Sequence, residues 1–238
     1  MLSINNLTVK YGQITAVREV SFEVKKGEIA CIVGPNGAGK STTLLTISGV
    51  LKPSTGDINL DNNTIAGFSP EQIAGLGVTQ VPEGRHIFTS LTVEENLKVG
   101  AALRNDKNTI AQDIERITTL FPILGERRQQ QAGKLSGGEQ QMLAIGRALM
   151  TNPSIMTIDE PSLGLAPIII DKVYEALVSL RKETGLTLLI VEQSAERALQ
   201  FADMIYVLRN GEIKLKGTSK ELKGNDKISK AYFGFDER

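Results

Sequence analysis

The sequence predicts an α/β fold with a parallel β-sheet, an antiparallel β region and an inserted helical region. Residues 29–33 are continuously apolar and residues 155–158 mainly apolar, which is typical of strands buried on both faces. A helical pattern at 167–183 separates the second run from a third at 186–191, the order of parallel strands joined by a right-handed crossover. Residues 56–60 alternate polar and apolar, as in a half-buried antiparallel strand.

The remaining elements follow from local signals. Residues 2–11 and 20–24 are β-like, and a helix is expected from residues 40–41 towards Gly49. Capping boxes begin at Ser69, with proline next, and at Thr92. Asn210-Gly211 between 205–209 and 212–216 predicts a hairpin. We expect one domain over 1–238. Its core and antiparallel region span about 1–90 and 151–225, its helical region about 91–150, and 226–238 form a helix or a tail.

Composition excludes several classes of protein. The 238 residues are 41% hydrophobic, enough for one substantial core. Basic and acidic residues both number 27, and this formal net charge of +0 argues against broad attraction to nucleic acid or anionic lipid. No run of about 18 apolar residues is present, and the first six residues do not resemble a signal peptide. The single cysteine, Cys31, allows no intramolecular disulfide and is expected in a buried strand. We therefore expect a soluble cytoplasmic protein.

Residues 34–41 match the phosphate-binding pattern G-x-x-x-x-G-K-[ST] between a strand and a helix. Such a turn presents backbone N–H groups at a positive helix terminus, where phosphate oxygens bind. Lys40 adds a charged donor for the β- and γ-phosphates, and the Ser41 hydroxyl can reach Mg²⁺. The core is therefore of the P-loop NTPase type. The predicted nucleotide-binding residues in this segment are Gly34, Pro35, Asn36, Gly37, Ala38, Gly39, Lys40, Ser41 and Thr42.

Asp159 and Glu160 follow the apolar run at 155–158, at the carboxyl end of a predicted core strand. Ligands bind at such strand ends in open α/β sheets. Asp159 can hold Mg²⁺, directly or through water, and Glu160 can act as general base towards an attacking water.

Ser136, Gly137, Gly138 and Glu139 also fit a capping box, which requires no glycine pair. Two glycines at a helix start leave N–H groups unobstructed, a property that suits phosphate binding. Because residues 34–41 already hold the phosphates within one chain, this second surface is expected to serve the ATP of another subunit.

The order and spacing of these three motifs resemble the ATP-binding cassette family over essentially the whole chain. The division into a core, an antiparallel region and a helical region rests partly on this resemblance. The resemblance implies that Glu160 is the general base and that Tyr11 stacks on adenine. It also implies a head-to-tail dimer, homo- or heteromeric, that binds ATP and Mg²⁺ and works with membrane permeases. A cytoplasmic location on the inner face of the membrane follows, with a periplasmic or extracellular substrate-binding protein as an indirect partner.

The sequence departs from the usual family pattern at three positions. Glu83 occupies the place of a glutamine that contacts Mg²⁺, and Gln80 is the other candidate for that role. Gln193 occupies the place of the family's switch histidine, and Ala166 that of a frequent aspartate. Glutamine can donate a hydrogen bond to a γ-phosphate, but unlike histidine it cannot take up a proton and become positively charged. We assign catalytic roles to Glu83 and Gln193, and we also assign Glu83 to the Mg²⁺ site. The only histidine, His86, is expected at the surface or at an interface.

Four segments, residues 81–85, 136–149, 159–167 and 191–193, together resemble one branch most closely. That branch is the second ATPase subunit of bacterial importers for branched-chain amino acids. The related urea-importer branch is the nearest alternative. A soluble cassette acting in repair or translation is disfavoured, since no long insertion, strong basic surface or second cassette is seen. A small-molecule kinase is disfavoured by residues 135–140.

Overall fold

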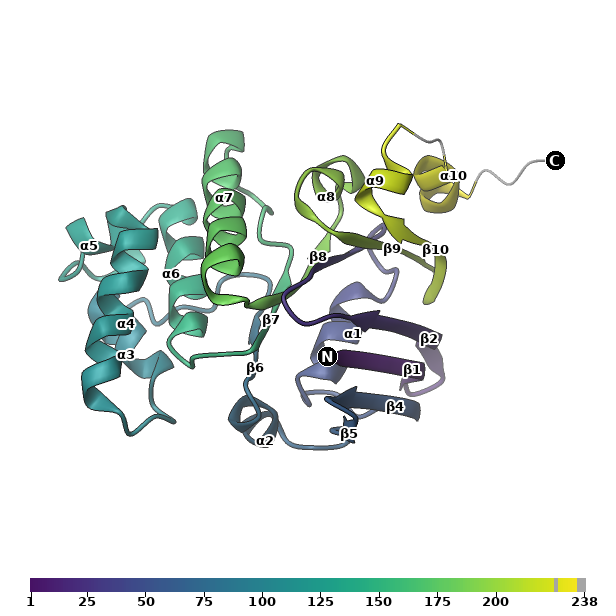
Figure 1. Cartoon of the computed structure of the whole chain (residues 1–238), viewed down its shortest axis with the longest axis horizontal. Coiled ribbons are helices and arrows are strands. Elements are labelled where there is room, and N and C mark those ends of the chain that lie inside the picture. The colour runs from purple at the N-terminus through teal and green to yellow at the C-terminus, as the bar shows by residue number, and fades with distance from the viewer. Residues whose placement is uncertain (225–226, 235–238) are drawn as a thin grey trace.

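The computed structural model describes residues 1–224 and 227–234. Two β-sheets lie side by side, the helices of residues 93–184 lie at one end of the molecule, and the last helices lie at the opposite end (Figure 1). The larger sheet has six strands in the order β10-β9-β3-β8-β7-β6. Its members are β3 (Ile29–Val33), β6 (Val78–Val81), β7 (Ile155–Asp159), β8 (Thr187–Glu192), β9 (Met204–Arg209) and β10 (Glu212–Thr218). All neighbours are parallel except β9 and β10, which confirms the predicted α/β class.

The smaller sheet is antiparallel, in the order β2-β1-β4-β5. It contains β1 (Leu2–Tyr11), β2 (Ile14–Val24), β4 (Thr55–Leu60) and β5 (Asn63–Thr64). Strand β2 begins six residues before the predicted 20–24. Its pairing with β1 is irregular between Leu7 and Val9, and Glu19 has a φ of 47°. This bulge interrupts the alternation by which a strand is recognised in sequence.

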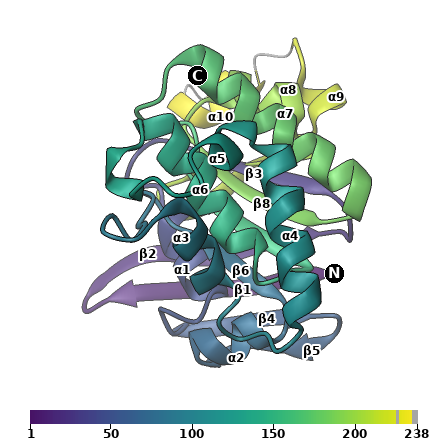
Figure 2. The same ribbon diagram turned by 90° about the vertical axis from the view of Figure 1, so that its left-hand side faces the viewer.

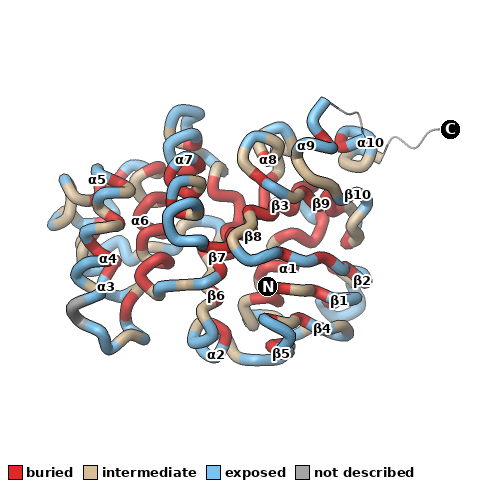
Figure 3. Tube along the Cα trace, in the orientation of Figure 1, coloured by how far each residue is buried: buried red, intermediate tan, exposed pale blue. Residues whose placement is uncertain are grey.

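The buried strands alternate between two cores, which explains their continuous apolar runs. Ile29, Cys31 and Val33 face a core shared with the helices, whereas Ala30 and Ile32 face a core shared with the smaller sheet. Strand β8 behaves in the same way, with Leu188 and Ile190 on the first side and Leu189 and Val191 on the second. The tube of Figure 3 shows this buried layer in the middle of the molecule.

Helix α1 (Lys40–Ile47) follows β3, and α2 (Pro70–Gly75) precedes β6. The helical region contains α3 (Val93–Gly100), α4 (Lys107–Leu120), α5 (Pro122–Glu126), the 3₁₀ turn Ala132–Lys134 and α6 (Gly137–Leu149). These helices lie together in both ribbon views (Figures 1 and 2). The two predicted capping boxes are confirmed, because Ser69 and Thr92 each accept a hydrogen bond from the residue three positions on.

Helix α7 (Pro167–Thr184) connects β7 to β8, close to its predicted extent. Helix α8 (Ala195–Phe201) and the short α9 (Ser219–Leu222) flank the final hairpin. The hairpin prediction is confirmed, with φ angles of 53° at Asn210 and 80° at Gly211. Helix α10 (Lys227–Phe233) lies within the segment expected to be a helix or a tail, and residues 226 and 235–238 of that segment lie outside the described residues. In the described part of the chain, no helix is both long and apolar enough to cross a bilayer.

Candidate functional site

The loop between β3 and α1 encloses a cavity of about 460 Å³. Gly39 has a φ of 102°, and a Cβ there would lie 2.6 Å from the Ala16 carbonyl oxygen. Only glycine therefore fits this turn. Helix α1 begins at the next residue, and among the described residues no side chain caps it. Its first N–H groups are thus available to an anion, as the motif predicts.

Lys40 lies under this loop and is 4% exposed. Its ammonium group donates to the carbonyl oxygens of Gly34 (2.9 Å) and Pro35 (3.1 Å). Its Nζ also lies 3.3 Å from Oε1 of the buried Glu160. The loop therefore holds the cation at the helix N-terminus, where a phosphate would be bound.

Glu160 directly follows β7 and has a left-handed backbone with a φ of 46°. Its N–H donates to the Val191 carbonyl of the neighbouring strand, at 3.0 Å. Such a conformation is uncommon for a residue other than glycine and is maintained by its surroundings. It turns the Glu160 side chain into the cavity, where Gln193 and Glu83 also lie.

Gln193 connects the Glu160 carboxylate to the phosphate loop through hydrogen bonds. Its Nε2 donates to Glu160 Oε2 and to Asn36 Oδ1, both at 2.8 Å. The glutamine that stands in the usual histidine position is therefore in contact with both the carboxylate and the phosphate loop. A side-chain amide has two N–H donors, and both are used here.

Asp159 is buried at the end of β7, and its Oδ1 has no hydrogen-bond partner among the described residues. Burial raises its pKa to about 6, opposed by a hydrogen bond from Ser41 and assisted by the charges of Glu160 and Glu83. An unpartnered buried oxygen beside a hydroxyl and a second carboxylate is a donor set that suits Mg²⁺. No group of three or more His, Cys, Asp or Glu side chains in the described chain could hold a metal alone. Phosphate oxygens and water would have to complete the shell.

The structure separates the two candidates for the usual glutamine position. Glu83 lines the phosphate cavity, whereas Gln80 lines a different cavity beside Phe88 and Arg147. Because the two residues are an odd number of positions apart, an extended segment directs their side chains to opposite sides, and the two cavities agree with this. His86 is exposed and has a φ of 46°.

Tyr11 lies at the end of β1, with its hydroxyl 3.4 Å from Thr42 Oγ1. Tyr11 is 48% exposed, so an adenine base could reach it. Its position therefore agrees with the role that the resemblance implies.

The glycine pair at the start of α6 lies outside this cavity. Ser136 accepts from the Glu139 N–H, which confirms the cap. Gly137 is partly exposed, and a Cβ there would meet only the flexible end of Arg85. Gly138 is buried, and a Cβ there would lie 2.4 Å from Ile169 Cγ2. Close packing against α7 is thus a reason for Gly138 that sequence reasoning missed, whereas Gly137 and Ser136 are accessible.

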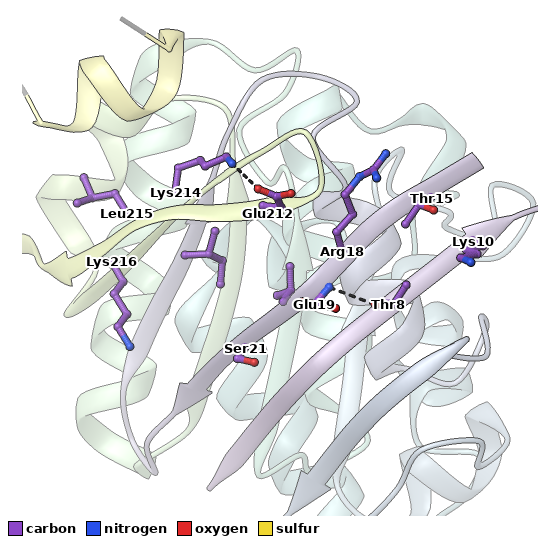
Figure 4. Close-up of a pocket in the computed structure, with 12 residues that line it drawn as sticks. Thr8, Lys10, Thr15, Arg18, Glu19, Ser21, Glu212, Lys214, Leu215 and Lys216 are labelled. Atoms are coloured by element: carbon purple, nitrogen blue, oxygen red, sulfur yellow. Dashed lines mark hydrogen bonds and ion pairs between the residues drawn. The ribbon is translucent and has the colours of Figure 1, made fainter. Parts of the chain in front are cut away.

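A second groove, of about 680 Å³, lies between β2 and β10 (Figure 4). Its labelled side chains include Lys10, Arg18, Lys214 and Lys216, and its acids are Glu19 and Glu212. None of the site residues predicted from the sequence lines it. The nucleotide cavity is therefore the one beside Lys40 and Glu160.

The parallel sheet, the glycine turn at a helix N-terminus and the Asp159–Glu160 pair define an ATPase of the P-loop class. A model of the ABC transporter family matches residues 17–163. The chain belongs to the ABC transporter family and is an ATP-hydrolysing member of it.

Two curated relatives cover nearly the whole chain. The sequence is 47% identical to the high-affinity branched-chain amino acid transport ATP-binding protein BraG of Pseudomonas aeruginosa, over 98% of this chain and 100% of BraG. It is 36% identical to the probable branched-chain amino acid transport ATP-binding protein LivF of Archaeoglobus fulgidus, over 98% of this chain and 99% of LivF.

Two solved structures share the fold. A nucleotide-free ATP-binding cassette from an ABC transporter superposes with a TM-score of 0.86 at 29% identity, covering 98% of each chain. A dimeric post-hydrolysis cassette bound to ADP and Pi superposes with a TM-score of 0.82 at 26% identity, covering 92% of this chain and 99% of that one.

Proposed function

We propose that this chain is the ATPase subunit of an importer for branched-chain amino acids. Its placement of Lys40, Glu160 and Gln193 around one cavity carries the ATPase part of the proposal. BraG and LivF are branched-chain amino acid transport ATP-binding proteins, which supports the choice of substrate. Permease chains would form the pore, and this chain would bind to their inner face.

In the proposed reaction, residues 34–42 bind the phosphates through backbone N–H groups and Lys40, while Tyr11 stacks on the base. Glu160 accepts a proton from the attacking water and orients it towards the γ-phosphate. Gln193 holds the Glu160 carboxylate through one N–H and Asn36 through the other. This arrangement positions the base against the phosphate loop.

Mg²⁺ would be held by Ser41 and Asp159, with Glu83 near enough to contribute, and would supply charge stabilisation to the phosphate oxygens. The unpartnered Asp159 Oδ1 is the observation that supports this assignment.

We further propose that the cavity is completed by a second ATPase subunit, through its residues 136–139. The accessible Ser136 and Gly137 support this, as does the dimeric state of one structural relative. Leu163 lies at the rim of the cavity and is 49% exposed, so it would be covered in such a dimer.

The permease would dock beside residues 83–86, on the cavity of about 260 Å³ that Gln80 lines. Three large apolar side chains are exposed around it: Phe88, Val99 and Leu103. Gln80 Nε2 and Arg147 Nη1 are buried there without a partner among the described residues. A docking segment with apolar side chains and hydrogen-bond acceptors would match these groups.

The test is uptake by proteoliposomes that contain this chain with its co-purified permease and binding protein. We expect ATP-dependent uptake of labelled leucine, and none when Glu160→Gln replaces the parent. Uptake of urea without leucine, or export of lipid, would contradict the proposal.

A further inference from the structure

Glu192 is a carboxylate buried in the core at the end of β8, with 1% of its surface exposed. Successive residues of a strand point to opposite faces, so Glu192 shares the helix-facing side with Leu188 and Ile190. Gln193, the next residue, points to the phosphate cavity. Two consecutive residues therefore have opposite environments: the Glu192 carboxylate is buried in the core, and the Gln193 side chain lies in the phosphate cavity.

The buried carboxylate accepts hydrogen bonds from two other elements. Tyr174 of α7 donates its hydroxyl to Oε1, and Ser162 donates to Oε2 at 3.1 Å. Burial, followed by the charge of Glu192, raises the pKa of Tyr174 far above its ordinary value, so the hydroxyl remains a donor. The Tyr174 ring is in turn stacked on Phe201 of α8, with centroids 4.2 Å apart.

Arg197 determines which group donates in each hydrogen bond of this network. Arg197 Nη1 donates to Ser162 Oγ at 2.7 Å and lies 3.9 Å from Glu192 Oε2. Ser162 therefore accepts from Arg197 and gives its own proton to Glu192. Because an arginine cannot accept a hydrogen bond, the hydroxyl holds only one orientation here, and it ties the Ser162 side chain to Glu192 at the end of β8.

Ser162 lies two residues beyond Glu160, and Leu163 is at the rim of the phosphate cavity. The same carboxylate thus tethers the segment after Glu160 and directly precedes Gln193, which contacts Glu160 from the other strand. The Glu160 carboxylate is therefore positioned from two directions, by the segment that follows it and by Gln193. Glu192 contacts the first of these and directly precedes the second.

We propose that Glu192 is a positioning residue for ATP hydrolysis: through Ser162 and Gln193 it fixes the geometry of the Glu160 carboxylate. This inference rests on the proposed roles of Glu160 and Gln193. The phosphate loop makes no contact with Glu192 among the interactions of the described residues, so nucleotide binding is expected to be independent of it.

The test compares steady-state hydrolysis by Ser162→Ala, Ser162→Thr and Glu192→Gln with the parent. Ser179→Ala is the matched control, because Ser179 bonds Glu183 on the exposed side of α7. We expect Ser162→Ala and Glu192→Gln to lower kcat about tenfold while the KM for ATP changes less than about twofold, since one hydrogen bond acting in the transition state is lost. Ser162→Thr keeps the hydroxyl and should retain most of the parental kcat.

The double variant Ser162→Ala/Glu192→Gln should be no slower than the slower single variant, because both changes break one network. A parental kcat in Ser162→Ala would overturn the proposal, even if Glu192→Gln failed to fold. A loss of thermal stability with unchanged kcat would also overturn it, since that is the signature of a purely structural cluster. Glu160→Gln in the same assay separates the two levels: full activity there refutes the proposed base, whereas an inactive Glu160→Gln with a fully active Ser162→Ala refutes only the positioning role.

Discussion

Lys40 and Glu160 form a buried ion pair across the phosphate cavity, with 3.3 Å between Lys40 Nζ and Glu160 Oε1. The motif assigns Lys40 to ATP, but here the lysine is already paired with two backbone carbonyls and this carboxylate. A bound γ-phosphate would compete with Glu160 for that ammonium group and release the carboxylate towards water. In this structure the proposed base is therefore paired with Lys40.

Replacing the lysine tests the nucleotide-binding role of the loop. Lys40→Ala removes a charge-assisted hydrogen bond worth about 1.5–3 kcal/mol, so we expect ATP affinity to fall roughly tenfold to a hundredfold. Isothermal titration with ATP measures this. Lys52→Ala, at an exposed position, is the control and should bind as the parent does.

Replacing the carboxylate tests the base. Glu160→Gln keeps the shape of the side chain but cannot accept the proton, so we expect hydrolysis to fall by about 10²–10⁴-fold with ATP binding retained. Phosphate release under saturating ATP is the measurement. A variant within threefold of the parental rate would exclude Glu160 from this role.

We expect the Gln193 amide to contribute to the rate of ATP hydrolysis through its hydrogen bond to Glu160. Gln193→Ala removes the hydrogen bond to that carboxylate, and we expect about a tenfold lower kcat. Gln193→His can still donate one hydrogen bond and should fall between the alanine variant and the parent. Equal rates for all three proteins would remove Gln193 from the catalytic group.

The helical region contains an ion-pair network whose strength depends on pH. Hydrogen bonds from Lys98 and Arg128 lower the pKa of Glu94 to about 2. Because the folded-state pKa lies below the ordinary value, this stabilisation is present above about pH 4.5 and is lost as the pH falls towards 2. Allowing for partial exposure, we expect Glu94→Gln to lower the free energy of unfolding by about 1 kcal/mol at pH 7.

Urea unfolding at pH 7 and pH 3 checks this prediction. The difference between Glu94→Gln and the parent should shrink at the lower pH. Glu126→Gln, an exposed glutamate of α5, should differ little from the parent at either pH. A constant difference for Glu94→Gln would show that packing, not charge, is what Glu94 supplies.

Local patterns were sufficient to predict the phosphate loop and the strands beside it. An apolar run, glycines at fixed spacing and a lysine lie within a dozen residues, so β3 and the start of α1 could be located directly. Strand β2 was predicted too short, because its bulge at Glu19 breaks the alternation. The packing role of Gly138 was missed because Ile169 lies on another helix.

Contacts between distant segments could not be read from the sequence. Gln193 and Asn36 are 157 residues apart, yet they are hydrogen-bonded in the cavity. Glu192 is the clearest example, since its partners Ser162, Tyr174 and Arg197 come from three separate segments. In sequence it is simply a charged residue at the end of an apolar run.

In the proposed dimer, Ser136 and Gly137 bind the ATP held by the phosphate loop of a second subunit. The most direct measurement is the mass of Glu160→Gln by sedimentation velocity, at micromolar protein with and without ATP. We expect twice the monomer mass with ATP and the monomer mass without it. Gly137→Asp in the same background should abolish the dimer while ATP still binds. If Glu160→Gln stayed monomeric at saturating ATP, residues 136 and 137 would not serve the ATP of a second subunit.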